Sequence, residues 1–186
     1  MKVIAAVAVM LASLTAQPLL AQGSFVDPST GFGLTVAAPF TVEPVSRRQF
    51  DVGVGVKSST GLPPIVRTGQ FVCEVGFKAA AQNNDVTREE INALVQKPEW
   101  RRLARAAIGL VFTITAERTF ILAGFRGIEY QARPKAGPGS EDVRTLMSIV
   151  ETPKGRITIF CLTNKKAFQS SVASFRSLRN GVTLPQ

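Results

Sequence analysis

The segment from Gln70 to Lys78 alternates apolar and polar side chains, and it constrains the fold more than any other part of the sequence. Its apolar positions recur at every second residue and are Phe71, Cys73, Val75 and Phe77. The opposite face carries Glu74 and Lys78. A period of two is typical of a strand that buries one face and exposes the other. The chain therefore needs a second layer of structure to cover the apolar face of this strand.

The region before this strand also predicts extended backbone. Residues 31–35, 40–45 and 50–56 have the composition of strands. In the third of these segments, Gly53 and Gly55 share one face. Because glycine has no side chain, we expect another segment of backbone to approach closely at that face.

Most of the C-terminal half is also expected to be strand. Residues 110–132 are rich in β-branched and aromatic side chains and predict several antiparallel strands, with a turn at residues 116–118. Gly124 and Gly127 are expected at bends or bulges. Residues 146–152 and 156–162 are predicted to pair through a tight turn at Pro153-Lys154-Gly155.

Three helices are predicted around these strands. Thr87 and Glu90 form the pattern of a capping box, so the first helix should begin there and end near Pro98. Pro98 can itself open a second helix, because the first turn of a helix needs no N–H from it. The third helix should run from about Lys165 to Leu178, capped by Asn164. Its apolar stripe is formed by Phe168, Val172 and Phe175.

The order of these elements is strands, two helices, more strands and a final helix, which predicts an α+β fold: an antiparallel β-sheet flanked by helices. The chain resembles the PsbP-like fold of photosystem oxygen-evolving subunits and of many small secreted bacterial domains. The matching features are Gly31-Phe32-Gly33-Leu34 followed by Pro39, the central run of hairpins, the turn at Pro153-Lys154-Gly155 and the terminal helix Phe168 to Arg176. The resemblance spans most of residues 25–180. It implies a binding or assembly module without a shared catalytic apparatus.

The first residues predict export from the cytoplasm. A lysine at position 2 precedes the apolar run Val3 to Leu14, and Ala21 offers a small residue at a cleavage point. We expect residues 1–21 to be a signal peptide and residues 22–186 to be one periplasmic or secreted α+β domain without a transmembrane segment. The alternative is an uncleaved membrane anchor, which Pro18 disfavours because it interrupts the apolar stretch before it reaches spanning length.

Histidine is absent from the chain, which excludes several classes of enzyme. Ser-His-Asp hydrolysis, Cys-His proteolysis and His-ligated zinc all require it. The glycine-containing loops also lack the residues of nucleotide motifs. We therefore expect no catalytic residues, no metal and no cofactor, and predict a non-enzymatic binding or assembly module. The alternatives are an envelope carrier of lipid or another small ligand and a hydrolase based on two carboxylates.

The two cysteines, Cys73 and Cys161, are both expected to face the core, since each shares the phase of the apolar residues around it. In an exported protein an even number of cysteines favours a disulfide. The alternative is a pair of separate buried thiols that pack as small apolar side chains.

A basic stripe is the candidate interaction surface. Arg101, Arg102 and Arg105 fall on one side of the second helix, and the other side carries Trp100, Leu103, Ala104 and Ala107. With a formal net charge of +9, an exported chain would meet an envelope protein or an anionic surface rather than nucleic acid. The alternative is an ordinary amphipathic helix whose charged face lies in water.

Overall fold

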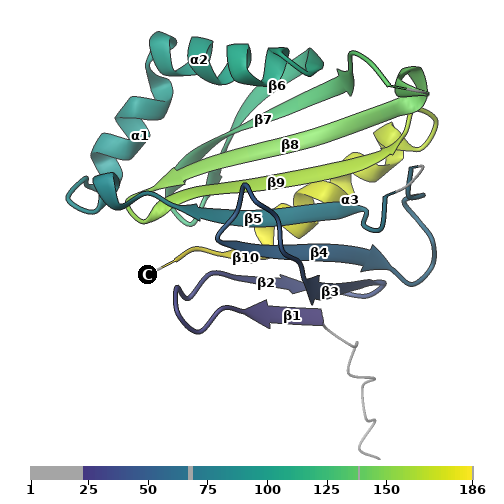
Figure 1. Cartoon of the computed structure of the whole chain (residues 1–186), viewed down its shortest axis with the longest axis horizontal. Helices are drawn as coiled ribbons and strands as arrows, with labels where there is room; N and C mark the ends of the chain where they lie inside the picture. Colours follow the sequence, from purple (N-terminus) through teal and green to yellow (C-terminus); the bar gives the residue numbers. More distant parts are fainter. Residues whose placement is uncertain (1–22, 67–68, 138, 186) are drawn as a thin grey trace, which may run out of the picture.

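In the part of the chain that the computed structural model describes, residues 23–66, 69–137 and 139–185, ten strands build two antiparallel sheets (Figure 1). The larger sheet has the order β3-β4-β5-β9-β8-β7-β6, and the smaller has the order β1-β2-β10. The strands of the larger sheet are β3 (Phe40–Pro44), β4 (Val52–Ser58), β5 (Cys73–Ala79), β6 (Phe112–Leu122), β7 (Phe125–Pro134), β8 (Val143–Thr152) and β9 (Gly155–Asn164). Those of the smaller sheet are β1 (Gly23–Val26), β2 (Gly33–Val36) and β10 (Val182–Thr183).

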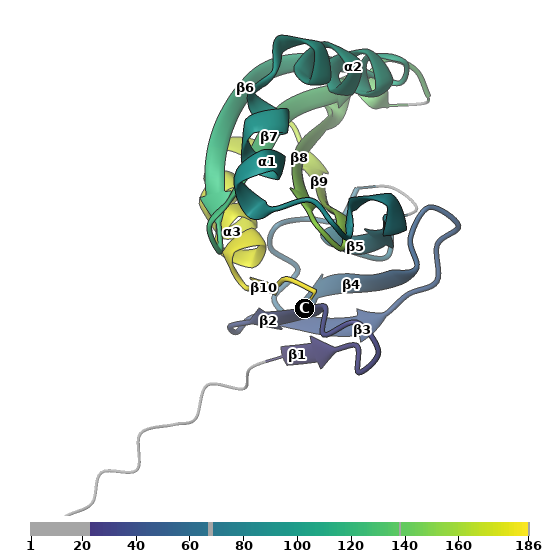
Figure 2. The ribbon, with the colours of Figure 1, turned by 90° about the vertical axis from the view of Figure 1, so that its left-hand side faces the viewer.

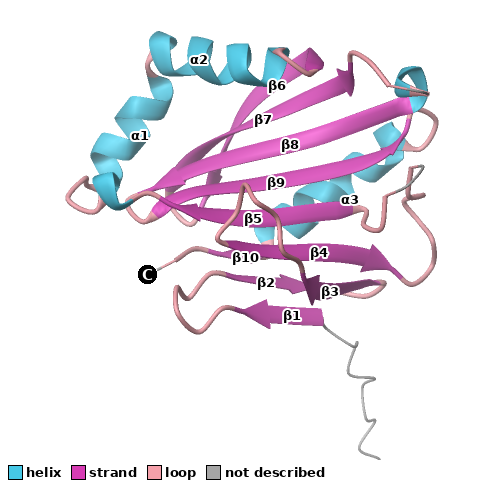
Figure 3. Ribbon diagram, viewed as in Figure 1, coloured by secondary structure: helices cyan, strands magenta, loops and turns pink. Residues whose placement is uncertain are grey.

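The helices are α1 (Arg88–Gln96), α2 (Pro98–Gly109) and α3 (Phe168–Asn180), with short 3-10 turns η1 (Ala81–Asn83) and η2 (Ser140–Asp142) (Figure 3). This arrangement confirms the predicted α+β class, an antiparallel sheet flanked by helices. No helix of the described residues is long and apolar enough to cross a membrane. The predicted signal peptide, residues 1–21, lies outside the described residues.

The helices lie on opposite faces of the larger sheet, and the alternation of β8 shows which face each covers. Leu146 and Val150 belong to the main core together with the apolar stripe of α3. The intervening side chains, Met147 and Ile149, pack with residues of α1 and α2 in a second, smaller cluster. Figure 2 shows that the sheet curves strongly, with α2 and α3 far apart on its two sides.

The helix starts follow local chemistry. Thr87 and Glu90 form the predicted capping box: the Glu90 amide donates to Thr87 Oγ1 at 3.2 Å, and the Thr87 amide donates to Glu90 Oε2 at 2.8 Å. Pro98 is the first residue of α2, as predicted. At α3, Asn164 Oδ1 accepts from the Ala167 amide at 2.8 Å, so the asparagine fixes a turn and the helix begins three residues later than predicted.

The predicted turn at Ala116 to Arg118 is wrong, because β6 runs unbroken through it and forms a long hairpin with β7. The chain reverses instead at Ala123 and Gly124, which both have positive φ angles, 47° and 85°. This conformation is easiest for glycine. Ala116 lies at a register shift between the two strands, where a bulge lets β6 continue.

The disulfide between Cys73 and Cys161 confirms the predicted pairing. The two residues are direct partners in the register of β5 and β9, and both are fully buried on the face that α3 covers. The bond joins positions 88 residues apart in the sequence. On β4, a Cβ at Gly53 would lie 2.7 Å from the Val45 carbonyl oxygen, which confirms the close backbone approach, whereas the Phe71 ring fills the space beside Gly55.

Candidate functional site

A groove lies between α2 and the strands β8 and β9, and we call it the α2 groove. Its volume is 760 Å³. One wall is formed by Trp100, Leu103, Ala107 and Val111, and the floor includes Met147, Ile149 and Thr158. Gln49 lines the side opposite α2. The volume falls within the range of small-molecule sites, and the lining is mainly apolar.

The α2 groove exists because α2 rests on the sheet by only one edge of its apolar side. Ile108 points into the small core and is buried, whereas Leu103, about half a turn of the helix away from it around the axis, is 67% exposed. Trp100 is half-buried against the same cluster. The apolar flank that the sequence placed on this helix is therefore mostly left open beside the sheet.

A second cavity, of 390 Å³, continues the groove across β9 toward β5. The two cavities share five lining residues: Gln49, Phe112, Met147, Arg156 and Thr158. The ring of Phe160 packs against Phe112 with 5.7 Å between centroids. Lys78 enters the lining at this end. The combined groove is thus apolar beside α2 and more polar beside β5.

The connection between β3 and β4 forms the far wall and is held in place by three contacts. Arg47 donates to both oxygens of Glu74, at 2.6 and 2.9 Å. Asp51 accepts from the Lys78 ammonium at 2.5 Å. The Phe50 ring covers Gly76, where a Cβ would lie 2.2 Å from the ring atoms. Reasoning from the sequence missed this wall, although the glycine on the polar face of an alternating strand was a signal that another side chain fills that place.

The charged groups of the groove are mostly engaged with one another. Arg156 donates to the buried carboxylate of Glu151 at 2.6 and 2.7 Å. Glu74, which Arg47 holds, is the only carboxylate among the described residues that line the two cavities. A hydrolase that works with two carboxylates needs a second acid beside the first. Among the described lining residues, Glu74 has no second acid beside it.

The predicted basic stripe lies on the other flank of α2, above β6. Arg101, Arg102 and Arg105 line a pocket of 450 Å³ together with Gln96, Pro98 and Glu117, which we call the arginine pocket. Arg105 bonds to Glu117, and Arg101 Nη1 lies 4.0 Å from the same carboxylate. Two of the three predicted arginines thus turn toward the sheet, and Arg102 has no ion pair among the described residues.

Below this pocket, Tyr130 lies opposite Glu117 in the register of β6 and β7. Its side chain is fully buried, and its hydroxyl has no hydrogen-bond partner among the described residues. Burial raises the pKa of Tyr130 to about 12, and the negative charge of Glu117 adds to the shift. The hydroxyl is therefore neutral and remains a potential donor.

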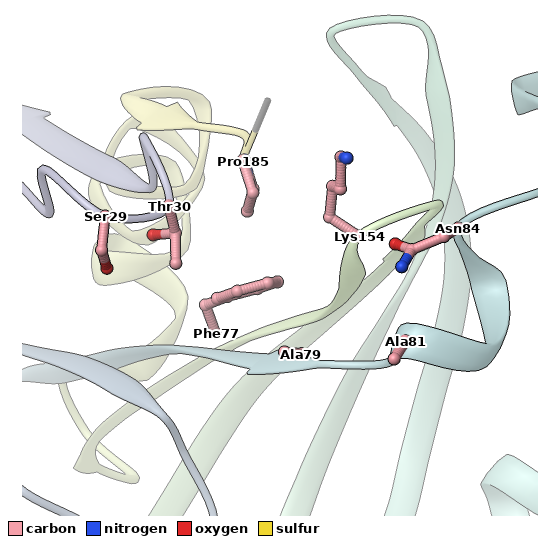
Figure 4. A pocket seen from close by; sticks show the side chains of 8 residues that line it. All are labelled: Ser29, Thr30, Phe77, Ala79, Ala81, Asn84, Lys154 and Pro185. Carbon is pink, nitrogen blue, oxygen red and sulfur yellow. The ribbon is translucent and has the colours of Figure 1, made fainter.

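A fourth, smaller hollow of 240 Å³ lies at the end of β5 (Figure 4). Ser29 and Thr30 stand on one side of it, Asn84 and Lys154 stand on the other, and Phe77 lies between them. Both hydroxyls already donate to Asp27, at 2.6 and 2.7 Å. This hollow is too small and too occupied by internal hydrogen bonds to compete with the α2 groove as a binding site.

Comparison with solved structures identifies the architecture. The solution structure of cyanobacterial PsbP (CyanoP) from Synechocystis is similar over 94% of this chain and 98% of that chain, with a TM-score of 0.55 and 12% sequence identity. A Pseudomonas aeruginosa protein of unknown function, PA94, described as a putative regulator, matches over 89% of this chain and 97% of its own, with a TM-score of 0.44 and 8% identity. No protein-family model and no curated protein matches the sequence.

Proposed function

The chain has the PsbP-like fold, and on that premise we propose that it is an exported, non-catalytic binding module that takes the apolar chain of an anionic amphiphile into the α2 groove. The observation that carries this proposal is the 760 Å³ apolar space beside α2. Its far wall is held by two ion pairs and a packed ring, so that side of the space is preformed. A preformed apolar space lowers the cost of binding an apolar ligand.

The anionic head of the ligand is assigned by the charges at the polar end. Lys78 and Arg156 line the cavity near β5, and the one carboxylate there, Glu74, is already engaged by Arg47. Each cation has an internal partner, but both side chains are about half exposed, so each ammonium or guanidinium keeps donors for a ligand. A carboxylate or phosphate head at this end would complement them.

Export is supported by two features. The apolar run at residues 3–14 has the pattern of a signal peptide. The disulfide between Cys73 and Cys161 is of a kind that persists in oxidising compartments such as the bacterial periplasm. A periplasmic or secreted location follows from these features as part of the proposal.

The test uses two neighbouring alanines of α2. Ala107 lines the groove, whereas Ala106 is exposed and lies outside the lining. We expect Ala107→Trp to fill the groove and to weaken binding of a naturally fluorescent fatty acid at least 10-fold, with Ala106→Trp unchanged. The corresponding fatty alcohol should bind more weakly than the acid, and Lys78→Gln should reduce that preference. Equal binding by both tryptophan variants would contradict the proposal.

Assembly with an envelope protein is the second candidate, and the end of α2 favours it. Leu110 is 81% exposed and Val111 is 59% exposed, side by side just after the helix. Exposed apolar residues that adjoin a groove are typical of protein interfaces. Leu110→Ser should abolish capture of such a partner and leave fatty-acid binding intact.

A further inference from the structure

The arginine pocket is separate from the α2 groove, because the two lie on opposite flanks of the same helix. Its lining shares no residue with that of the groove. Three guanidinium groups face one carboxylate there, which leaves two positive charges in excess. Glu117 is only 12% exposed and is already bonded to Arg105, so it cannot neutralise Arg102 as well.

The first turn of α2 carries one acid, Glu99, which does not line the pocket, and the backbone N–H groups of this turn add to the positive field. Pro98 lines the pocket and is the first residue of the helix. The residue before it, Lys97, makes no capping hydrogen bond with its side chain. The first amides of a helix point outward without an intrahelical acceptor and carry the positive end of the helix dipole. An anion in this pocket would face both the arginines and this end of α2.

A buried polar group without an acceptor among the described residues lies beside the arginine pocket. The Tyr130 hydroxyl is buried and unpartnered beside Glu117, and the charges of Arg101 and Arg105 act on it. A buried hydroxyl without an acceptor is uncommon, because the missing hydrogen bond costs free energy. A phosphate that draws Arg101 and Arg105 toward itself would leave the Glu117 carboxylate free to accept from this hydroxyl.

From this geometry we infer that the arginine pocket binds a phosphate group. A guanidinium presents paired N–H donors that match two phosphate oxygens, and such charge-assisted hydrogen bonds are among the strongest in proteins. Arg102 has no ion pair among the described residues and supplies a free guanidinium. Arg101 precedes it directly in the chain, and Arg105 follows about one turn later. The source of the phosphate is a soluble phosphate ester or the head group of an anionic phospholipid.

The test compares two exposed arginines. Arg102 lies in the pocket, and Arg133 lies on β7 outside it; neither has an ion pair among the described residues. Binding of glycerol 3-phosphate is measured by calorimetry, and binding of vesicles is measured with phosphatidylglycerol mixed into phosphatidylcholine. We expect Arg102→Gln to lower the association constant about 10-fold in at least one arm. Arg133→Gln should lower neither.

The two arms identify the source. A loss with both probes assigns a site for the phosphate group itself, and a loss with vesicles alone assigns the lipid head group at a membrane surface. Equal binding by Arg102→Gln and the parent protein in both arms would overturn the inference. An equal loss of binding in the Arg102 and Arg133 variants would also overturn the inference, because such a loss would reflect the net charge of the protein alone. Ala107→Trp should keep phosphate binding, so this test stays independent of the groove.

Discussion

The two faces of the seven-stranded sheet are covered by helices in different ways. On one face, α3 seals the main core with Phe168, Val172 and Phe175, and the disulfide lies beneath it. On the other face, α2 rests on a much smaller cluster and leaves Leu103 mostly exposed. The closed face holds the fold together, whereas the half-open face provides both candidate binding sites.

The charged groups show the same difference. Under α3, the fully buried carboxylate of Glu129 accepts from Arg176 at 2.6 Å and from Arg179 at 2.8 Å. Arg179 is itself buried and lies over the ring of Phe120, 4.0 Å from its centroid. Under α2, the carboxylate of Glu117 is shared between guanidinium groups that line an open pocket. Ion pairs in the closed core connect α3 to the sheet, whereas the arginines at the open pocket remain available to a ligand.

The largest effect is expected from the disulfide on the closed face. Replacing Cys73 and Cys161 together by alanine should lower the free energy of unfolding by about 4.6 kcal/mol on the chain-entropy model, because the bond closes a long loop. The thermal midpoint should fall by about 10 °C without loss of the fold, as measured by calorimetry. Two alkylatable thiols in freshly isolated, denatured protein would show that the bond does not form.

Core packing gives a direct contrast between the faces. Phe175→Ala removes a fully buried ring beneath α3 and should lower the free energy of unfolding by about 3 to 5 kcal/mol. Leu103→Ala removes an exposed side chain from α2 and should change it by less than about 0.5 kcal/mol. Urea unfolding measures both. A large loss in the Leu103 variant would mean that the half-open face is in fact closed.

The buried ion network should give a somewhat smaller effect. Glu129→Gln leaves three guanidinium groups, those of Arg118, Arg176 and Arg179, without their counter-charge, so we expect a loss of about 3 kcal/mol in the free energy of unfolding. Glu43→Gln is the control, because Glu43 pairs with Lys57 at the surface and should contribute at most about 1 kcal/mol. Similar losses in the two variants would show that the buried ion pairs stabilise the fold no more than the surface pair does.

The smallest effect concerns the wall of the α2 groove and its response to pH. The hydrogen bond from Lys78 lowers the pKa of Asp51 below its usual value. A carboxylate whose pKa is lower in the folded state stabilises that state above its unfolded pKa, and the contribution is lost as the pH falls through the folded pKa. Because the pair is largely exposed, the loss below about pH 4 should stay under about 0.5 kcal/mol. Asp51→Asn should remove this pH dependence in unfolding experiments.

Elements governed by local chemistry were predictable from the sequence. The capping box of α1 involves two residues three positions apart, and the strand that contains Cys73 and Val75 shows its period within nine residues. The turn predicted at residues 116–118 failed because Glu117 and Arg118 look polar enough for a turn. In the structure they point to opposite faces of β6: Glu117 pairs with Arg105, and Arg118 pairs with Glu129. Such partners lie far along the chain or on another element and leave no local signal.

For the same reason, the sequence predicted only part of each candidate site. The helical period separated the arginines of α2 from its apolar residues, which is a local property. Whether the sheet covers the arginine side or the apolar side of α2 depends on how the helix packs on β6 to β8. This packing leaves no local signal in the sequence. The wall of the groove depends on Glu74 and Gly76 meeting a connection about 27 residues earlier in the chain.

The disulfide lies where the two halves of the larger sheet meet, since its N-terminal strands end at β5, and β5 pairs there with β9 from the C-terminal half. A protease that cuts the backbone at any exposed connection between residues 74 and 160 would therefore leave two fragments that are still covalently linked. On a gel, such clipped protein would migrate as two pieces only after reduction. The molecule can thus be cut once between its two cysteines without losing either half.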